Sequence, residues 1–168
     1  MDNVYKFIKN KHFNSVQEIF FESSLKKTFK NQNEKDIFFD KWCGQYLNNE
    51  LAYVYEEDDE CLGYILLCKD TLKFLENNED NGLRTFIDLY KDFPWHLHIN
   101  FKSSARGRGL GSKLLTFAKT MASPNGIHLI TGEDSRNVSF YNKNGFTHTS
   151  KREVNSMNLL FMGYKPNN

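Results

Sequence analysis

The chain has 168 residues, of which 39% are hydrophobic and 15% aromatic, so it is long enough to bury a core and too apolar to be disordered throughout. The formal net charge is +1, which gives no electrostatic reason to expect nucleic acid or an anionic membrane as a partner. The three cysteines, Cys43, Cys61 and Cys68, cannot all pair and lack zinc-site spacing. Because the sequence shows no signal peptide and no apolar run near the ~20 residues of a membrane span, we expect a cytoplasmic protein.

The N-terminal third predicts one strand and two helices. The strand is expected at residues 4–8. Ser15-Val16-Gln17-Glu18 has the pattern of a capping box, which predicts that a helix opens there and runs to about Leu25. A second helix is expected near residues 34–47, where aromatic side chains recur on one stripe: Phe38, Trp42 and Tyr46.

A hairpin and a long connection follow. Residues 51–55 and 62–68 are predicted strands on either side of the acidic turn at residues 56–60. This turn either faces water or attracts a cationic amine by its field. In residues 69–94 the apolar spacing indicates two short helices separated by residues 77–82. This connection is either a packed surface insertion or a part of an acceptor pocket.

Residues 106–111 read Arg-Gly-Arg-Gly-Leu-Gly, between an apolar stretch at residues 95–101 and an amphipathic helix pattern. Glycines let the main chain approach a ligand closely, and the N–H groups of a first helical turn have no partner within the helix. A diphosphate placed there would gain those donors, the positive end of the helix and the charges of Arg106 and Arg108. The helix is expected to end at residues 123–126, before a strand at residues 127–131.

The loop differs from two common phosphate-binding patterns. It lacks the Gly-Lys-Ser/Thr ending of a Walker loop, and Ser112 stands where a dinucleotide fingerprint needs its third glycine. What remains is Arg-x-x-Gly-x-Gly, formed by Arg106, Gly109 and Gly111. Between a fourth strand and a third helix, this pattern resembles the coenzyme A pyrophosphate loop of the GNAT superfamily of N-acyltransferases.

A second landmark follows about thirty residues later. Residues 136–146 resemble the late helix of the same superfamily, in which Phe-Tyr is followed by a basic turn and Gly-Phe. Gly145 fits a helix C-cap, and Phe146 would open the next strand.

The resemblance implies an α/β fold with a mixed central sheet of about seven strands, a splayed pair at strands 4 and 5, and flanking helices. It also implies one domain over residues 1–168, with the helical insertion at about 69–94. The expected reaction is transfer of an acetyl group from acetyl-CoA to a primary amine by direct attack in a ternary complex, by a monomer or homodimer without a metal ion. A small-molecule amine is the favoured acceptor. A peptide or protein amine, and a non-catalytic acyl-CoA sensor, are the alternatives.

The resemblance also assigns the residues that bind the coenzyme. Strand backbone would align the pantetheine arm and polarise the thioester carbonyl, the glycine loop would hold the pyrophosphate, and two residues of the late helix would touch pantetheine or phosphate unless they are simply solvated. The expected cofactor-binding residues are Ile99, Asn100, Phe101, Arg106, Gly107, Arg108, Gly109, Leu110, Gly111, Ser112, Asn137 and Lys143.

His96 and His98 alternate with apolar residues on the predicted fourth strand, so the two histidines share one face. Three interpretations compete for them. A metal site is disfavoured because no carboxylate or cysteine is suitably spaced nearby. A structural pair bonded to backbone or water is the second. The third is proton handling, because the strand resembles the histidine-bearing strand of serotonin N-acetyltransferase and its relatives.

The chemistry explains why a base would help. An alkylamine with a pKa of about 10.4 is only about 0.04% neutral at pH 7, and only the neutral form attacks a thioester. A histidine can take that proton directly or through water. His98 is favoured over His96 because it lies closer to the glycine loop. Glu133 and Asp134 are alternative bases, or simply parts of a solvated turn or helix N-cap.

Tyr141 has the complementary role in the resemblance, as the usual general acid of the superfamily. A phenol can stabilise or protonate the departing thiolate of coenzyme A. The alternative is an aromatic side chain that only packs in the core.

Overall fold

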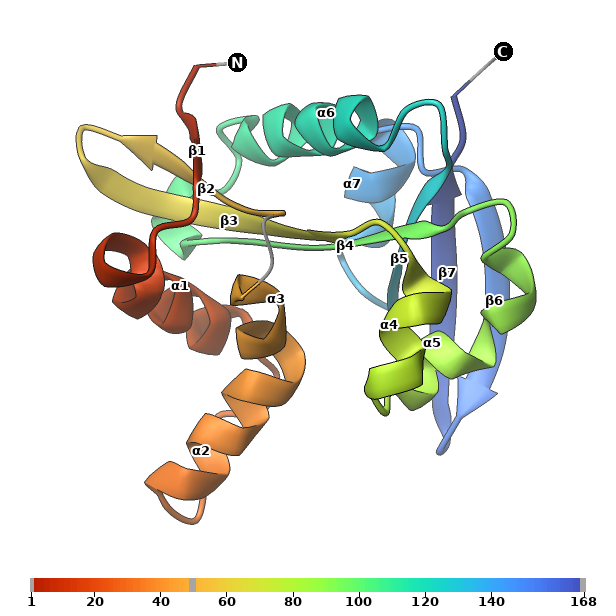
Figure 1. Ribbon diagram of the computed structural model, residues 1–168, viewed down its shortest axis with the longest axis horizontal. Helices are drawn as coiled ribbons and strands as arrows, with labels where there is room; N and C mark the ends of the chain where they lie inside the picture. The colour runs from red at the N-terminus through yellow and green to blue at the C-terminus, as the bar shows by residue number, and fades with distance from the viewer. Residues whose placement is uncertain (1, 49–50, 167–168) are drawn as a thin grey trace. The chain divides into compact units, whose positions relative to one another are not determined.

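The computed structural model describes residues 2–48 and 51–166 (Figure 1). Its seven strands form one sheet in the order β1-β2-β3-β4-β5-β7-β6. The pairing of β4 with β5 is parallel, whereas β1–β2, β2–β3, β5–β7 and β6–β7 are antiparallel. The expected α/β fold with a mixed sheet of seven strands is therefore confirmed. Within the described residues, no helix is both long and apolar enough to cross a bilayer.

The chain divides into two compact units, which are described in turn. Unit 1 comprises Met1–Leu67 and His98–Leu114, and unit 2 comprises Cys68–Leu97 and Leu115–Asn168. The strand β4 and the helix α6 each contribute residues to both units. The prediction of a single domain over residues 1–168 and that of a splayed strand pair stay predictions.

Unit 1 holds the N-terminal strands and helices. Figure 1 shows α1 along one side of the β2–β3 hairpin. The elements are β1 (Val4–Lys6), α1 (Lys9–Ser23), α2 (Gln32–Phe39), a π-helical turn (Asp40–Gly44), α3 (Gln45–Leu47), β2 (Ala52–Glu57), β3 (Glu60–Cys68), the second half of β4 (Trp95–Phe101), a 3-10 turn (Ser103–Ala105) and the start of α6 (Leu110–Ala122).

The predicted start of the first helix is wrong. The helix begins at Lys9, six residues before the capping-box serine, so Ser15 lies within it and the preceding strand ends at Lys6. The buried face of α1 continues back through Val16 to His12, whose Nδ1 accepts a hydrogen bond of 2.8 Å from the Ile8 N–H. The buried His12 therefore accepts a free backbone N–H at the start of the helix. The sequence pattern had predicted that Ser15 would do so.

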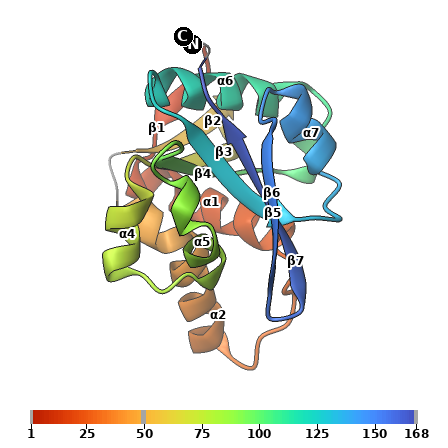
Figure 2. The same cartoon turned by 90° about the vertical axis from the view of Figure 1, so that its right-hand side faces the viewer.

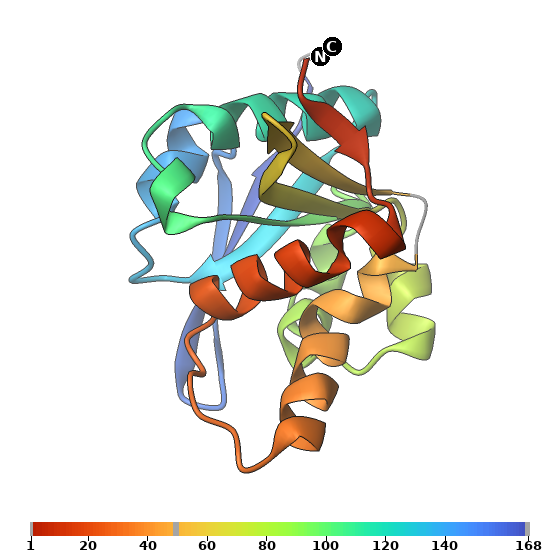
Figure 3. The ribbon, with the colours of Figure 1, turned by 90° about the vertical axis from the view of Figure 1, so that its left-hand side faces the viewer.

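The second helical segment runs close to its predicted range, but its buried positions match the predicted stripe only in part. Burial follows Phe39, Cys43 and Leu47, whereas Trp42 of the predicted stripe is 37% exposed. Figure 3 shows α2, the π-helical turn and α3 as one continuous helical run. A π turn has more residues per turn than an α-helix, so positions four apart stay in line along such a run. The predicted stripe was therefore right at Tyr46, which is 3% exposed, and wrong at Trp42.

The hairpin is longer than predicted, and its turn is shorter. The strands β2 and β3 extend into the acidic segment and leave a two-residue turn, Asp58-Asp59, in which both residues have positive φ (50° and 62°). That geometry suits tight hairpins, and aspartate tolerates it better than most residues. Three of the acidic side chains are paired rather than simply solvated, since Glu56, Glu57 and Glu60 contact Lys11, Arg108 and Lys102.

Unit 2 holds the long connection and the C-terminal strands. Figure 2 shows α4 and α5, in green, on one side of the strands β5, β7 and β6. The elements are α4 (Thr71–Asn77), α5 (Asn81–Thr85), a 3-10 turn (Ile87–Leu89), the first half of β4, the rest of α6, β5 (Ile127–Gly132), α7 (Val138–Lys143), β6 (His148–Val154) and β7 (Met157–Tyr164).

The two short helices expected in the connection are present, and their first turns are capped. The side chains of Asp70 and Asp80 accept the N–H groups of Lys73 and Leu83 at 3.0 and 2.9 Å. The connection packs on β7 through a buried apolar cluster of Leu75, Leu83, Phe86, Tyr90, Phe93 and Phe161. An ion pair of Asp88 with Arg152 of β6 adds to this contact. The segment is therefore a packed part of unit 2.

Candidate active site

His96 is fully buried in unit 2 and is bonded to α4. Its Nδ1 lies 2.9 Å from the hydroxyl of Thr71, and this hydroxyl donates to the carbonyl of Pro94 at 2.8 Å. The Thr71 hydroxyl therefore lies within hydrogen-bond distance of both the His96 ring and the Pro94 carbonyl and ties the ring to the start of α4. The His96 ring also packs edge-on against Phe74, with ring centroids 5.1 Å apart. These contacts fit the structural interpretation of His96 better than the catalytic one.

His98 belongs to unit 1 and is half-buried. Its Nε2 lies 3.1 Å from the hydroxyl oxygen of Tyr46, and the two ring centroids are 4.8 Å apart. Tyr46, at the C-terminal end of the α2–α3 run, is 3% exposed. The sequence indicated Tyr46 as a packing aromatic, and no local pattern pointed to its contact with His98, because 52 residues separate the pair.

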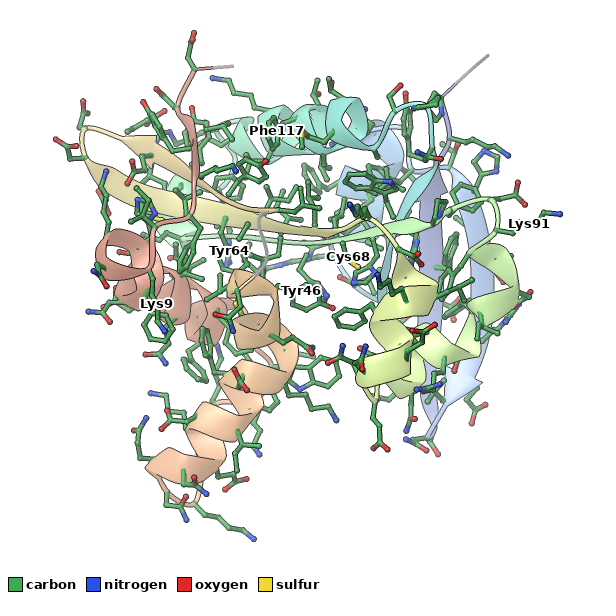
Figure 4. All side chains as sticks on the ribbon, viewed as in Figure 1. Lys9, Tyr46, Tyr64, Cys68, Lys91 and Phe117 are labelled. Atoms are coloured by element: carbon green, nitrogen blue, oxygen red, sulfur yellow. The ribbon has the colours of Figure 1, made fainter. Side chains whose placement is uncertain are left out.

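Asn100 lies two residues further along β4, and its side chain is also engaged within unit 1. Its Nδ2 donates to the hydroxyl of Tyr64 at 2.7 Å. Burial raises the pKa of Tyr64, and it raises the pKa of the neighbouring Cys43 thiol to about 12. Both groups stay protonated at neutral pH, and a buried, protonated thiol is a poor nucleophile. Figure 4 labels Tyr46 and Tyr64, which come from α3 and β3.

The glycine loop has a backbone that suits a bound diphosphate. Gly107 and Gly109 have φ angles of +77° and +78°, a region that favours glycine. A Cβ built on either glycine would meet no heavy atom of the described residues within 4 Å, so space lies open above both. The N–H of Lys113 reaches the Gly109 carbonyl at 3.3 Å and begins the helical ladder.

The first turn of α6 therefore presents free donors. The N–H groups of Leu110, Gly111 and Ser112 precede the ladder and have no acceptor within the helix. Together with the open space at the glycines, they fit the negative oxygens of a diphosphate. The loop thus has the features that the sequence motif predicts.

Both arginines of the loop have partners inside unit 1, which the sequence did not indicate. Arg106 donates to the Phe101 carbonyl at 3.2 Å and to the Ser23 hydroxyl at 3.3 Å. Arg108 forms an ion pair with Glu57 of β2. Arg106 therefore holds the loop against α1 and β4, and its predicted phosphate contact stays a prediction.

The end of α1 supports the same loop. The carboxylate of Glu22 accepts the backbone N–H of Ser103 at 2.9 Å, and hydrogen bonding by the side chain and then by the backbone of Ser103 holds the pKa of Glu22 below its usual value. Glu22 therefore binds Ser103, and Ser23 binds Arg106. These two contacts hold the segment that leads into the glycine loop against the end of α1. The sequence gave no sign of this support, which joins positions 81 residues apart.

Tyr141 lies in α7 of unit 2 and is buried. Burial raises its pKa to about 12, so the phenol is protonated at neutral pH. Its ring packs near Phe140 and Phe146, and no described residue forms a hydrogen bond with its hydroxyl. The helix ends as the sequence predicted, with Gly145 at φ +86° directly after the cap residue.

The remaining candidates of unit 2 lie at the surface or serve the fold. Asn137 is exposed at the start of α7, and Lys143 is exposed at its end. The carboxylate of Glu133 forms an ion pair with Lys151, while its N–H donates to the Asn158 carbonyl at 3.0 Å. Asp134 is exposed. The paired carboxylate supports a structural role for Glu133 over that of a base.

The comparisons with known proteins support the fold. The structure titled SsHAT is 18% identical, covers 95% of this chain and 96% of its own, and has a TM-score of 0.74. A histone acetyltransferase HPA2 and related acetyltransferase from Corynebacterium glutamicum is 19% identical over 98% of this chain and 96% of that one, with a TM-score of 0.72. The protein PH1933 from Pyrococcus horikoshii is 18% identical over 98% of each chain, with a TM-score of 0.66.

No curated protein matches this sequence. Residues 48–148, however, match the family model of the acetyltransferase (GNAT) domain, and this range includes the hairpin, β4, the glycine loop, α6, β5 and α7. With the fold and the loop geometry in agreement, the match leads to one conclusion. The chain belongs to the GNAT acetyltransferase family.

Proposed function

We propose that this protein transfers the acetyl group of acetyl-CoA to a primary amine, with a small molecule as the acceptor. One observation carries the proposal. In the glycine loop, two glycines with positive φ stand under open space, directly before the free N–H groups at the start of α6. The GNAT family uses acetyl-CoA, and a loop of this geometry suits the pyrophosphate of that co-substrate.

In this proposal the main chain binds most of the coenzyme. The backbone from Gly107 to Ser112 holds the pyrophosphate, with Arg106 and Arg108 supplying positive charge. The backbone of Ile99, Asn100 and Phe101 aligns the pantetheine arm. All three residues lie on the strand β4, whose main chain can form hydrogen bonds with an extended ligand. Asn137 and Lys143, both exposed, are the further residues that the family resemblance assigns to coenzyme contact.

His98 removes the proton of the acceptor amine in this proposal. The half-buried imidazole takes the proton, directly or through water, as the amine nitrogen forms a bond to the acetyl carbonyl carbon and the carbon–sulfur bond breaks. His96 has a weaker claim, because it is buried and bonded to Thr71. Counted from the ammonium form of the acceptor, the products are an acetamide, the free thiol of coenzyme A and one proton.

Tyr141 assists the departure of the thiolate. Its pKa of about 12 lies above the ~8.5 of a simple thiol, so complete proton transfer to the sulfur is uphill. A hydrogen bond from the neutral phenol to the developing thiolate is the larger contribution that such a group can make. The thiol then gains its proton from solvent or from the protonated base.

Two observations bear on the class of the acceptor. The acidic turn contributes less negative charge than its sequence suggests, because Glu56, Glu57 and Glu60 are all paired with cations. A solved structure at 16% identity, with a TM-score of 0.62, is a ribosomal-protein-alanine N-acetyltransferase from Brucella melitensis. Identity at that level shows the fold alone. A protein amine is therefore the alternative acceptor, which an experiment must distinguish from a small-molecule amine.

The test is an assay of thiol release from acetyl-CoA with a panel of amines. The panel contains amino acids, polyamines, aromatic alkylamines and short peptides with free N-termini, with one blank without amine. We expect release that depends on a small amine. Release with peptides alone would contradict the small-molecule acceptor. Tight binding of coenzyme A without release by any amine would instead favour a sensor.

A further inference from the structure

Tyr46 and His98 form a pair within unit 1 that links the α2–α3 run to the strand β4. The distance between the Tyr46 hydroxyl oxygen and the His98 Nε2 is 3.1 Å, and the rings are tilted by 55°. The tyrosine is buried and the histidine half-buried, so the pair is shielded on the tyrosine side and open on the histidine side. A buried hydroxyl on one ring nitrogen constrains both the plane and the tautomer of an imidazole.

The π-helical turn Asp40–Gly44 decides where Tyr46 points. One extra residue in a helix rotates everything after it by about 100°, so a regular α-helix over this turn would carry the Tyr46 ring away from His98. A Cβ on Gly44 would lie 2.5 Å from the carboxylate oxygen of Asp40, so a larger residue there would have to displace that exposed side chain. Such turns are frequent at functional sites, and this one lies directly before Tyr46.

Two titratable groups of unit 1 that lie on elements next to the pair are uncharged at neutral pH. On the same helical run Cys43 is protonated, and on β3 Tyr64 is protonated as well, because burial raises the pKa of both. Asp40 and Lys41 of the π-helical turn are exposed to solvent. Cys43 and Tyr64 therefore add no charge on this side, and the Tyr46 hydroxyl lies within hydrogen-bond distance of the His98 Nε2.

We propose that Tyr46 is the positioning residue for His98, and this inference rests on the function proposed above. The Tyr46 oxygen accepts the N–H of Nε2, so Nδ1 is the basic nitrogen. When Nδ1 takes the proton of the amine, the imidazolium keeps its hydrogen bond to the phenol oxygen, which stabilises the positive charge. A base oriented by a third group is the general logic of catalytic triads. Tyr46 does not touch the reacting atoms.

The kinetic test is Tyr46→Phe, which keeps the ring and removes the hydroxyl. We expect kcat to fall about tenfold or more, as for a lost hydrogen bond to a charged group, with the KM for acetyl-CoA nearly unchanged. The acidic limb of the kcat/KM profile should move to lower pH, because the imidazolium loses its acceptor. Tyr90→Phe is the matched control, since it removes another buried hydroxyl, which donates to the Leu83 carbonyl. A loss of activity in Tyr46→Phe without a moved limb would overturn the proposal.

A double-mutant cycle separates positioning from general support of the fold. In a His98→Gln background the base is absent, so adding Tyr46→Phe should lower the remaining turnover no further. Independent, additive losses would mean that Tyr46 acts on something other than His98, and the proposal would then be wrong.

Nitrogen NMR of labelled histidine gives a readout that needs no activity. The His98 signals are assigned by their loss in His98→Gln, and the neutral form should be the Nε2–H tautomer in the wild type. In Tyr46→Phe the titration of His98 should move to lower pH. This result would stand even if no amine were acetylated, in which case the proposed function alone would fail. An Nδ1–H tautomer, or an unmoved titration, would overturn the inference.

Discussion

Arg108 of the glycine loop and Glu57 at the end of β2 form an ion pair, although 51 residues separate them in the chain. The pair brings the acidic hairpin to the loop that we expect to bind phosphate. The hydrogen bond from Arg108 holds the pKa of Glu57 below its usual value, so the carboxylate stays charged at neutral pH. Glu57 therefore competes with an incoming phosphate for the same guanidinium.

Glu57→Gln should raise the affinity for coenzyme A. It frees Arg108 and removes a negative charge beside the loop, and exposed pairs of this kind change affinity by about two- to fivefold. The gain should shrink at high salt. Calorimetric titration with coenzyme A at two salt concentrations measures it, and Glu34→Gln, which removes the partner of Lys26, is the matched control. Equal or weaker binding by Glu57→Gln would show that Arg108 does not reach the phosphates.

Tyr141→Phe should lower kcat by about a hundredfold while the affinity for coenzyme A changes little, because a general acid or hydrogen-bond donor acts on the leaving group. Stopped assays of thiol release give kcat, and calorimetry gives the affinity. Phe keeps the ring contacts with Phe140 and Phe146, so thermal stability should be retained. Unchanged turnover would remove Tyr141 from the mechanism.

The free energy of unfolding should fall as the pH drops below about 6.5, the usual histidine value. His12 is buried, and burial lowers its pKa, although Glu56 opposes part of the effect. The unfolded chain then binds a proton more readily than the folded one, so the stability is full above the unfolded pKa and is lost below it. Urea unfolding between pH 7.5 and 5.5 measures the slope. His12→Gln should flatten it, and an equal slope in that variant would count against this assignment.

Phe86→Ala should destabilise the protein by about 3–5 kcal/mol, the usual loss for a large buried side chain. Phe86 is fully buried against Phe161 of β7, so the residue 69–94 segment should unfold with unit 2. The next residue offers a control, because Ile87 is 50% exposed and Ile87→Ala should change stability by less than about 0.5 kcal/mol. Urea unfolding measures this change. A small loss in the free energy of unfolding of Phe86→Ala would show that residues 69–94 contribute little to the stability of unit 2.

Local patterns were enough to predict the glycine loop and the elements around it. Gly107 and Gly109 adopt the positive φ that the motif requires, and α6 begins directly after them at Leu110. The end of the late helix could also be predicted, because Gly145 adopts the positive φ that ends a helix. In both places the conformation depends on residues next to each other in the chain.

Contacts between distant segments could not be predicted in this way. The pairing of Tyr46 with His98 and that of Arg108 with Glu57 exist only in the folded chain. The start of α1 shows a related failure. A four-residue capping pattern at Ser15 was outweighed by an apolar face that continues back to the buried His12. The energy of burying that face exceeds the contribution of one cap.

The most direct test of the central claim is calorimetric titration of coenzyme A into the wild type and into Gly109→Val. The variant forces a β-branched residue into a φ of +78° and fills the open space above the loop. We expect a stoichiometric heat for the wild type and a fall in affinity of at least about a hundredfold for the variant, equal to about 2.7 kcal/mol. Adenosine triphosphate at the same concentration should not displace coenzyme A. Wild-type protein without measurable affinity for coenzyme A, or a folded Gly109→Val that binds it equally well, would contradict the account.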